Sequence, residues 1–431
     1  MSSPENAPVN SPVSSPVNSP ISSPINSPIS SPILAPTAPI ARLFFVALAL
    51  LFLAIVLDEL RVPGTQIAVR YKSLARALPL AWLACLALPA GRRALPYRAT
   101  PSDLPLALFV IAAALSVAFG GRHWGDIRHL VAAIGIGLLT RSLLTSRTGR
   151  QQVLALFAVT FAVVLQHELR VHPDLWPPHE MGRYDLVTAN PNVLGFLFAM
   201  TAPLLLAWAV AAHGAWRVIV GLGFAAAVLG VLLTFSRVAA VGLAAGTVVV
   251  LATLPERRRA LLVASSAMVV FVASSRPDQW VHLRHSGDSY RPSIMATAVR
   301  IGLEHPVLGV GFGINNLEEI FADRYEASYG ERIFRFHSAN QLLDLFAGTG
   351  LVGTTLALWW MGRVGATALG WVASAAGTSA RIQAAGGLGA FVAIVVMSMG
   401  EPPLYAGKLL PLLFVLLAVI ETGPRGDTAR S

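Results

Sequence analysis

The chain has 431 residues, of which 55% are hydrophobic and only 13% charged. Soluble proteins carry about 25% charged residues, so most of this chain cannot be a soluble globular protein. Lysine occurs only at Lys72 and Lys408, so nearly all basic residues are arginine, and the net charge is +10. In a membrane protein this excess indicates topology and contact with anionic lipids rather than nucleic acid. The single cysteine, Cys85, excludes a disulfide framework and a thiolate metal site.

Residues 1–40 differ from the rest of the chain. The pattern NSPxSSPx repeats from Asn10 to Pro32, with proline at every fourth position. Proline at this spacing prevents a helix and removes the donors that a sheet needs, so we predict a disordered cytoplasmic tail. A ligand of the PxxP type is the alternative. No basic region precedes Arg42, so the segment does not resemble a signal peptide.

Beyond Arg42, apolar runs alternate with short basic or polar breaks. A membrane-spanning helix needs about 20 apolar residues. The sequence therefore predicts an all-α, polytopic membrane protein with about twelve transmembrane helices. The runs are 40–57, 74–90, 103–119, 129–145, 151–166, 187–211, 216–235, 238–254, 260–275, 338–361, 382–399 and 405–421.

Arginine-rich breaks predict the orientation of these helices. The PERRR break at 255–259 is the strongest marker of a cytoplasmic loop, and it places both termini in the cytoplasm. The expected divisions are helices one to nine in 41–275, a periplasmic loop at 276–337, three helices in 338–421 and a cytoplasmic tail at 422–431. Within the loop we predict helices over 292–304 and 315–325, joined by a turn at Gly309–Gly313. We expect a further inner segment at 363–381.

Four ionisable residues lie beside predicted spans, all on the outer side. They are Arg183, Arg237, Arg291 and His337. Ionisable groups at such places are functional candidates, because they are costly to keep near lipid. Three arginines and one histidine would suit a polyanion and one proton transfer. Each residue also has an interpretation without a function. Arg237 could reach the membrane interface, and Arg183 could be a solvated loop residue. Arg291 could pair with Asp288 on the surface, and His337 could lie at the interface without a role.

His337, Gln341 and Asp344 share one helical face, because they are spaced by four and three residues. A polar stripe on a membrane helix points into a cavity rather than into lipid. Asp344 is the only carboxylate well inside a predicted span, and it has pairing with an arginine as its alternative. The chain lacks DxD and HExxH motifs, and Gly309–Gly313 lacks the GK[ST] ending of a phosphate loop. We therefore predict no metal site, no cofactor and no nucleotide.

Four blocks together resemble the O-antigen ligase and polymerase superfamily. His337-Ser-Ala-Asn-Gln with the later Gly350 and Gly353 resembles its histidine block, and Ser236-Arg237 its SR block. Arg291 followed by residues 304–313 resembles the arginine and GxGxG loop. Arg183 with Asn190-Pro-Asn192 resembles the upstream block. The blocks cover about residues 180–360 in the order of the family.

The resemblance implies a metal-independent, inverting glycosyltransferase of the bacterial inner membrane that acts at the periplasmic face. Its implied donor is a glycan on undecaprenyl pyrophosphate, and its implied acceptor is lipid A–core. Arg237 and Arg291 would hold the pyrophosphate, and His337 would accept the proton of the acceptor hydroxyl. Further binding residues are expected among the neighbouring polar side chains: Arg183, Asn190, Asn192, Ser236, Asn340, Gln341 and Asp344. An O-antigen polymerase, a protein O-oligosaccharyltransferase and, from another class, a lipid flippase or transporter are the alternatives.

Overall fold

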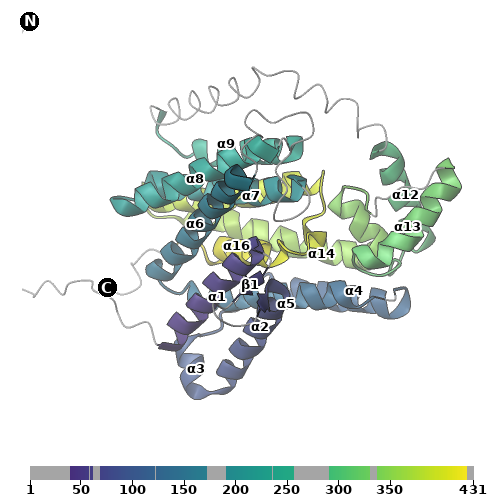
Figure 1. Ribbon diagram of the computed structural model, residues 1–431, viewed down its shortest axis with the longest axis horizontal. Coiled ribbons are helices and arrows are strands. Elements are labelled where there is room, and N and C mark those ends of the chain that lie inside the picture. The colour runs from purple at the N-terminus through teal and green to yellow at the C-terminus, as the bar shows by residue number, and fades with distance from the viewer. Residues whose placement is uncertain are drawn as a thin grey trace, which may run out of the picture. The chain divides into compact units, whose positions relative to one another are not determined.

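The structure, a computed structural model, describes residues 39–57, 59–61, 68–121, 123–171, 191–234, 236–256, 291–330 and 337–424. Within these residues every element longer than three residues is a helix, as the apolar runs predicted (Figure 1). A short antiparallel ladder, which the sequence did not predict, pairs β1 (Glu59–Arg61) with β2 (Ala68–Arg70). The proline-rich tail and the predicted span 260–275 lie outside the described residues.

The helices follow the apolar runs closely. The N-terminal part contains α1 (Pro39–Leu57), α2 (Tyr71–Ala87), α3 (Pro89–Ala94), α4 (Asp103–Phe119), α5 (Gly125–Leu143) and α6 (Arg147–Val171). The C-terminal part contains α7 (Pro191–Ala211), α8 (Ala215–Thr234), α9 (Arg237–Leu251), α12 (Arg291–Glu304), α13 (Ile314–Tyr329), α14 (Gln341–Ser374), α15 (Thr378–Ser398), the short 3-10 turn η3 (Pro403–Tyr405) and α16 (Leu410–Thr422).

Five helices of the described part are long and apolar enough to cross a membrane. They are Arg147–His167, Asn192–Ala211, Ala215–Thr234, Gln341–Ser374 and Thr378–Ser398. Shorter apolar helices cover Pro39–Ile55, Asp103–Phe119, Arg237–Leu251 and Leu410–Thr422. The predicted total of about twelve spans is therefore not confirmed.

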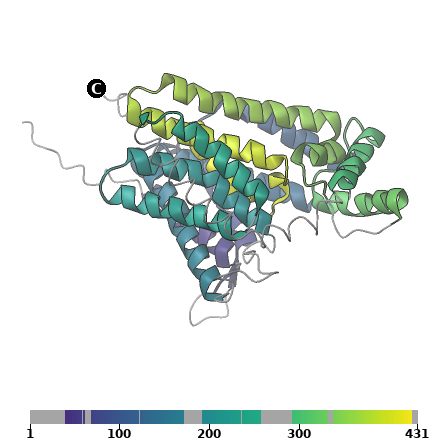
Figure 2. The same cartoon turned by 90° about the horizontal axis from the view of Figure 1, so that it is seen from above.

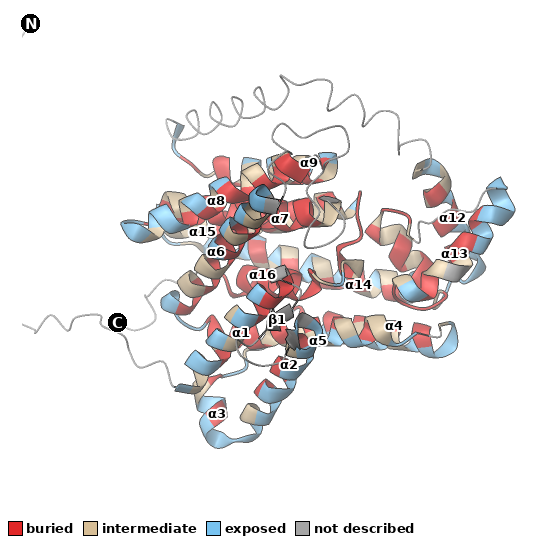
Figure 3. Cartoon of the chain, in the orientation of Figure 1, coloured by how far each residue is buried: buried red, intermediate tan, exposed pale blue. Residues whose placement is uncertain are grey.

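Large apolar side chains cover the outside of several of these helices. Leu222 on α8 is 65% exposed, and Leu358 on α14 is 52% exposed. Exposed apolar side chains of this size on apolar helices suit contact with lipid tails rather than with water. In contrast, α16 is buried along its whole length and lies inside the bundle (Figure 3). The chain is a membrane protein whose last helix forms part of its core.

Helices α7 and α9 run side by side in the same direction. A Cβ placed on Gly195 of α7 would lie 3.2 Å from the Cβ of Ser236, which directly precedes α9. Further along, a Cβ on Gly246 of α9 would lie 2.6 Å from Pro203 of α7. Small residues at both contacts let the two backbones approach closely, as is common between membrane helices. The first turns of α7 and α9 therefore lie at one end of the bundle.

Helix α15 packs against α9 in the opposite direction. A Cβ on Gly242, near the start of α9, would lie 2.3 Å from Met397, near the end of α15. A Cβ on Gly246, one turn further, would lie 2.5 Å from the carbonyl oxygen of Gly389. The end of α15 therefore lies beside the starts of α7 and α9.

Helix α14 is longer than its apolar run, and it is broken. The sequence predicted a span ending near residue 361 and a separate inner segment at 363–381, but the helix continues through Arg363 to Ser374. The non-helical residue is Gly350, with φ 62° and ψ −165°. Glycine tolerates this left-handed φ because it lacks a Cβ.

The turn at Gly309–Gly313 packs against this break in α14. The backbone N–H of Val310 donates to the carbonyl oxygen of Ala347 (3.0 Å), and that of Gly311 donates to the carbonyl oxygen of Gly348 (2.9 Å). The turn thus satisfies carbonyl groups that the interrupted helix leaves without their usual partners.

Helices α12 and α13 form an insert with a core of its own. This core also includes Ala347 of α14, and its members are Ile294, Ala298, Ile301, Val310, Leu317, Phe321, Tyr325 and Ala347. Asn316 of α13 ties the insert to the turn between α4 and α5, because it exchanges hydrogen bonds with the backbone of His123. Figure 2 shows α12 and α13 at one end of α14.

Candidate functional site

The starts of three helices and the segment after α15 come together at one end of the bundle. Asn192 in the first turn of α7 donates from Nδ2 to Oε1 of Glu401, at 2.6 Å. Asn340, which precedes α14, donates from Nδ2 to the carbonyl oxygen of Met399, at 3.4 Å. A Cβ on Gly400 would lie 2.5 Å from Val238 of α9. We call this region the helix-start cluster, which comprises Asn192, Ser236, Arg237, His337, Asn340, Gln341, Asp344 and Glu401.

Ser236 fixes the start of α9 and thereby the position of Arg237. Its φ and ψ of −85° and 107° are extended, and its Oγ accepts the backbone N–H of Ala239 at 3.4 Å. A serine N-cap of this kind ends the preceding turn and begins the helix. Arg237 is the first residue of α9, and its side chain is exposed. The positive charge thus adds to the partial positive charge of the helix start.

His337 is held by the backbone two residues later. Ala339 has a φ of 58°, which is uncommon for a residue with a Cβ, and its N–H donates to Nδ1 of His337 at 3.0 Å. A nitrogen that accepts a hydrogen bond carries no proton, so the neutral imidazole has its proton on Nε2. In this arrangement the ring presents Nε2 as a donor. The predicted role of His337 as proton acceptor stays a prediction, and it would require the ring to leave Ala339.

The polar stripe on α14 is buried and holds backbone. Asp344 is 0% exposed, and its Oδ1 accepts the N–H of Ser338 at 2.7 Å. The Oε1 of Gln341 accepts the N–H of Leu404 at 2.8 Å. Asp344 therefore contacts Ser338 rather than an arginine. Among the described residues, Oδ2 of Asp344 and Nε2 of Gln341 have no hydrogen-bond partner.

Asn340 is the N-cap of α14. Its Oδ1 accepts the backbone N–H groups of Leu342 (3.0 Å) and Leu343 (3.3 Å). The same side chain reaches the segment after α15 through Nδ2. One residue thus begins the helix and holds the neighbouring loop, which explains why an asparagine suits this position. Binding of substrate by Asn340 stays a prediction.

Glu401 is the member of the cluster that the sequence analysis missed. It follows the end of α15 in Gly400-Glu401-Pro402, and it is 7% exposed. The rule that singled out Arg237 and His337, an ionisable group beside a span, also applies to Glu401. In the sequence, the residue could have been noticed as a single carboxylate between the last two predicted spans.

The other predicted residues lie elsewhere. Arg183 and Asn190 lie outside the described residues. Arg291 begins α12 and is half-buried, so it belongs to the insert. Its helix packs on α13 through a contact between the hydroxyl groups of Ser293 and Tyr325, at 3.2 Å. The structure thus brings Asn192, Arg237 and the α14 block together, and it holds Arg291 by separate packing.

An apolar cavity of about 110 Å³ lies directly beside the cluster, between α14, α15 and α16. Gln341 and Met399 line it at the cluster end, and Trp360 and Met361 line it further along α14. The cavity therefore joins a polar region, which contains charged side chains of both signs, to an apolar one. An elongated molecule with a charged head and an apolar chain would match this combination.

A second polar region lies at the end of α16, away from the segment that carries Glu401. Arg141 of α5 pairs with Asp103 of α4 and Glu421 of α16, and Ser102 donates to Glu421. Burial and a hydrogen bond to Asp103 raise the pKa of Tyr97 to about 12, so its hydroxyl stays a donor at neutral pH. This network connects three helices, and none of the predicted site residues belongs to it.

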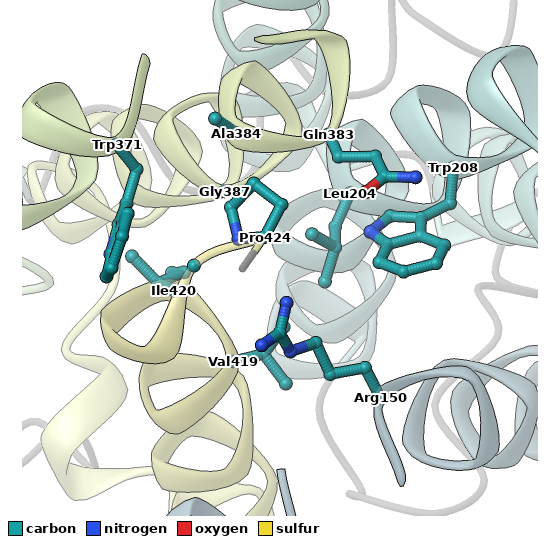
Figure 4. Close-up of a pocket in the computed structure, with 11 residues that line it drawn as sticks. Arg150, Leu204, Trp208, Trp371, Gln383, Ala384, Gly387, Val419, Ile420 and Pro424 are labelled. Atoms are coloured by element: carbon teal, nitrogen blue, oxygen red, sulfur yellow. The ribbon is translucent and has the colours of Figure 1, made fainter. Parts of the chain in front are cut away.

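A smaller pocket of about 20 Å³ also lies at the far end of α16. Figure 4 shows the guanidinium of Arg150 pointing toward Val419 and Pro424, with Trp208 and Trp371 on the two sides. The lining residues come from the last turns of α7, α14 and α16 and the first turns of α6 and α15. The length of these helices therefore separates the pocket from the helix-start cluster.

Comparison with known proteins finds one family. Residues 222–358 match the family model described as O-antigen ligase. This part of the chain is therefore similar to the O-antigen ligase superfamily. The match includes Ser236, Arg237 and His337, whereas Asn192 and Glu401 lie outside it. A comparison with curated proteins found no match.

The matched family is of the membrane glycosyltransferase type, and its members act on lipid-linked glycans. The match does not distinguish between members of the superfamily. Among the residues that the structure describes, no three His, Cys, Asp or Glu side chains form a group that would hold a metal ion.

Proposed function

We propose that the chain is an O-antigen ligase, which transfers a glycan from undecaprenyl pyrophosphate to lipid A–core at the periplasmic face of the bacterial inner membrane. The observation that carries this proposal is the meeting of three helix starts with Arg237 and His337 in an O-antigen ligase domain. Helix starts present backbone N–H groups and partial positive charge, and both favour phosphate groups.

The cluster supplies the interactions that a departing pyrophosphate needs. Arg237 would donate two parallel hydrogen bonds to phosphate oxygens, which lysine cannot do. Nε2 of His337 would donate a further one in the tautomer described above. As the bond between the sugar and the phosphate breaks, these donors would stabilise the growing negative charge on the leaving oxygen. Arg291 would reach the pyrophosphate from the insert.

The cavity between α14, α15 and α16 supports a polyprenyl donor. Its lining is apolar except for Gln341 and Ser398, and it begins at the cluster. A polyprenyl chain beside α14 would leave its pyrophosphate next to Arg237 and His337. The apolar lining also argues against a flippase, because moving a polar head across the membrane needs a polar path.

The test is transfer by purified protein from a defined undecaprenyl-pyrophosphate-linked glycan to lipid A–core. We expect wild-type protein to transfer, and His337→Ala to lose transfer while its amount in the membrane is unchanged. A deletion strain separates ligase from polymerase. We expect rough lipopolysaccharide with long polymer retained on the lipid carrier, whereas core bearing one repeat would identify a polymerase.

We also expect transfer to continue in EDTA without added nucleotide, because the sequence lacks acidic metal motifs and a phosphate loop. The measurement compares turnover before and after chelation. Activity that disappears in EDTA and returns with Mg²⁺ or Mn²⁺ would contradict the expected metal-independent mechanism.

A further inference from the structure

The proposed transfer needs a group that accepts the proton of the acceptor hydroxyl. In the helix-start cluster, Nδ1 of His337 already accepts the N–H of Ala339, and the proton of a neutral ring is on Nε2. Asp344 is fully buried, and its Oδ1 accepts the N–H of Ser338. Both groups are thus held by backbone N–H groups of the segment that precedes α14, and Asp344 is 0% exposed whereas Glu401 is 7% exposed.

Glu401 is the remaining carboxylate of the cluster. It lies in the loop between α15 and α16, beyond the end of α15 rather than inside a helix. Its neighbour Gly400 packs on Val238, which is next to Arg237. The segment that carries Glu401 therefore contacts the first turn of α9, which begins with Arg237. Asn192 donates to its Oε1 at 2.6 Å, and this hydrogen bond fixes its orientation.

We infer that Glu401 is the proton acceptor of the transfer reaction and that Asn192 positions it. This inference rests on the proposed function. The acceptor oxygen forms a bond to C1 of the donor sugar while the bond from C1 to the pyrophosphate oxygen breaks, and its electron pair stays on the pyrophosphate. The proton of the acceptor hydroxyl passes to the Glu401 carboxylate, which later releases it to water. His337 acts as a donor to the leaving group.

Several charged or titratable groups surround Glu401. Asp344 of α14 interacts with it electrostatically, and Arg237 and His337 begin the neighbouring segments. Tyr405 lies on its own segment and donates to the carbonyl oxygen of Asp344 at 3.2 Å. The pH dependence of turnover therefore has to be assigned by substitution and not from the wild-type profile alone.

The first experiment compares Glu401→Gln with Glu421→Gln, using the defined donor and acceptor. The amide side chain of Glu401→Gln keeps an oxygen that can accept the Asn192 N–H, so binding of donor should change by less than about threefold, whereas kcat should fall by about 10²–10⁴-fold. Glu421 is a matched control, because it is an equally buried glutamate at the opposite end of the bundle. Its substitution should lower stability without lowering kcat in this way.

The second experiment uses azide as the acceptor. Azide is an anion and needs no group to remove a proton, so Glu401→Gln should form the glycosyl azide at a rate close to that of wild-type protein. Loss of both reactions would mean that Glu401 only supports the fold of the site, and it would overturn the inference.

The third experiment records kcat against pH for Asn192→Ala. The proton acceptor must be ionised, so activity rises as pH increases through its pKa. The Asn192 N–H favours the ionised form, and its removal should move this acid limb to higher pH by about one unit. An unchanged pH dependence of kcat in the acid range would overturn the assignment.

Two further outcomes separate this inference from the proposed function. Wild-type protein that transfers nothing would overturn the proposed function, whereas full activity of Glu401→Gln would overturn this inference alone.

Discussion

Ala339 combines an unfavourable backbone conformation with a contact to the predicted catalytic histidine. The left-handed conformation costs about 1–2 kcal/mol for a residue with a Cβ. We expect Ala339→Gly to keep full transfer and to gain up to about 1 kcal/mol of stability. Ala339→Val should lose transfer, because a β-branched residue cannot hold this φ and the N–H would leave Nδ1 of His337. Turnover and thermal unfolding in detergent measure the two effects. Normal turnover of Ala339→Val would show that the hydrogen bond to His337 is dispensable.

At the scale of elements, the break in α14 and the glycine turn of the insert depend on each other. A Cβ on Gly309 would lie 2.4 Å from the carbonyl carbon of Gly348, and Gly309 has a φ of 68°. We expect Gly309→Ala to separate the insert from α14, because the added methyl group meets rigid backbone. Transfer should fall at least about tenfold, and proteases should cleave the insert faster.

Gly330→Ala is the matched control for this prediction. Gly330 ends α13 with a φ of 73°, and nothing lies within 4 Å of a Cβ placed there. Its substitution should cost only about 1 kcal/mol of backbone energy and leave transfer nearly normal. Equal effects of the two substitutions would show that backbone strain, rather than the contact with α14, explains the loss.

For the whole molecule, the pairs that Arg141 forms with Asp103 and Glu421 join α4, α5 and α16 far from the helix-start cluster. Arg141→Met should lower the free energy of unfolding by about 3–5 kcal/mol, because a buried carboxylate loses its partner. Adding Glu421→Leu to that variant should recover part of the loss. Thermal unfolding of the solubilised variants checks both expectations. The two single variants predict a certain loss of stability if their effects add. A double variant that loses more stability than this sum would contradict this account.

The proline-rich tail is expected to make no contribution to catalysis. Its composition predicts disorder, and the predicted topology places it on the face opposite the site. A truncation that begins near Pro36 should keep turnover within about twofold of full-length protein at equal expression. A large decrease would show that the repeat acts on the enzyme or on its substrates.

The sequence by itself determined the helices and most of the residues of the candidate site. In lipid the backbone must satisfy its own hydrogen bonds, so an apolar run of sufficient length becomes a helix whatever its neighbours are. This local rule explains why the expected apolar runs within the described residues agree with α1, α2, α4–α9 and α14–α16, apart from the longer end of α14. A similar rule identifies polar residues of the candidate site from the sequence. A polar side chain beside an apolar run is costly to keep near lipid, and this applies to Ser236, Arg237, His337 and Asp344.

Only the tertiary structure decided which of these residues meet. Helices α7, α9 and α14 are separated along the chain, and their starts come together because glycines let α7, α9 and α15 approach closely. The break at Gly350 could not be predicted from hydropathy, because a glycine in an apolar run is compatible with a continuous helix. Glu401 lies beside a predicted span, but only its contact with Asn192 shows which other residues it meets. Such contacts depend on the direction and packing of whole helices, which no local pattern of residues determines.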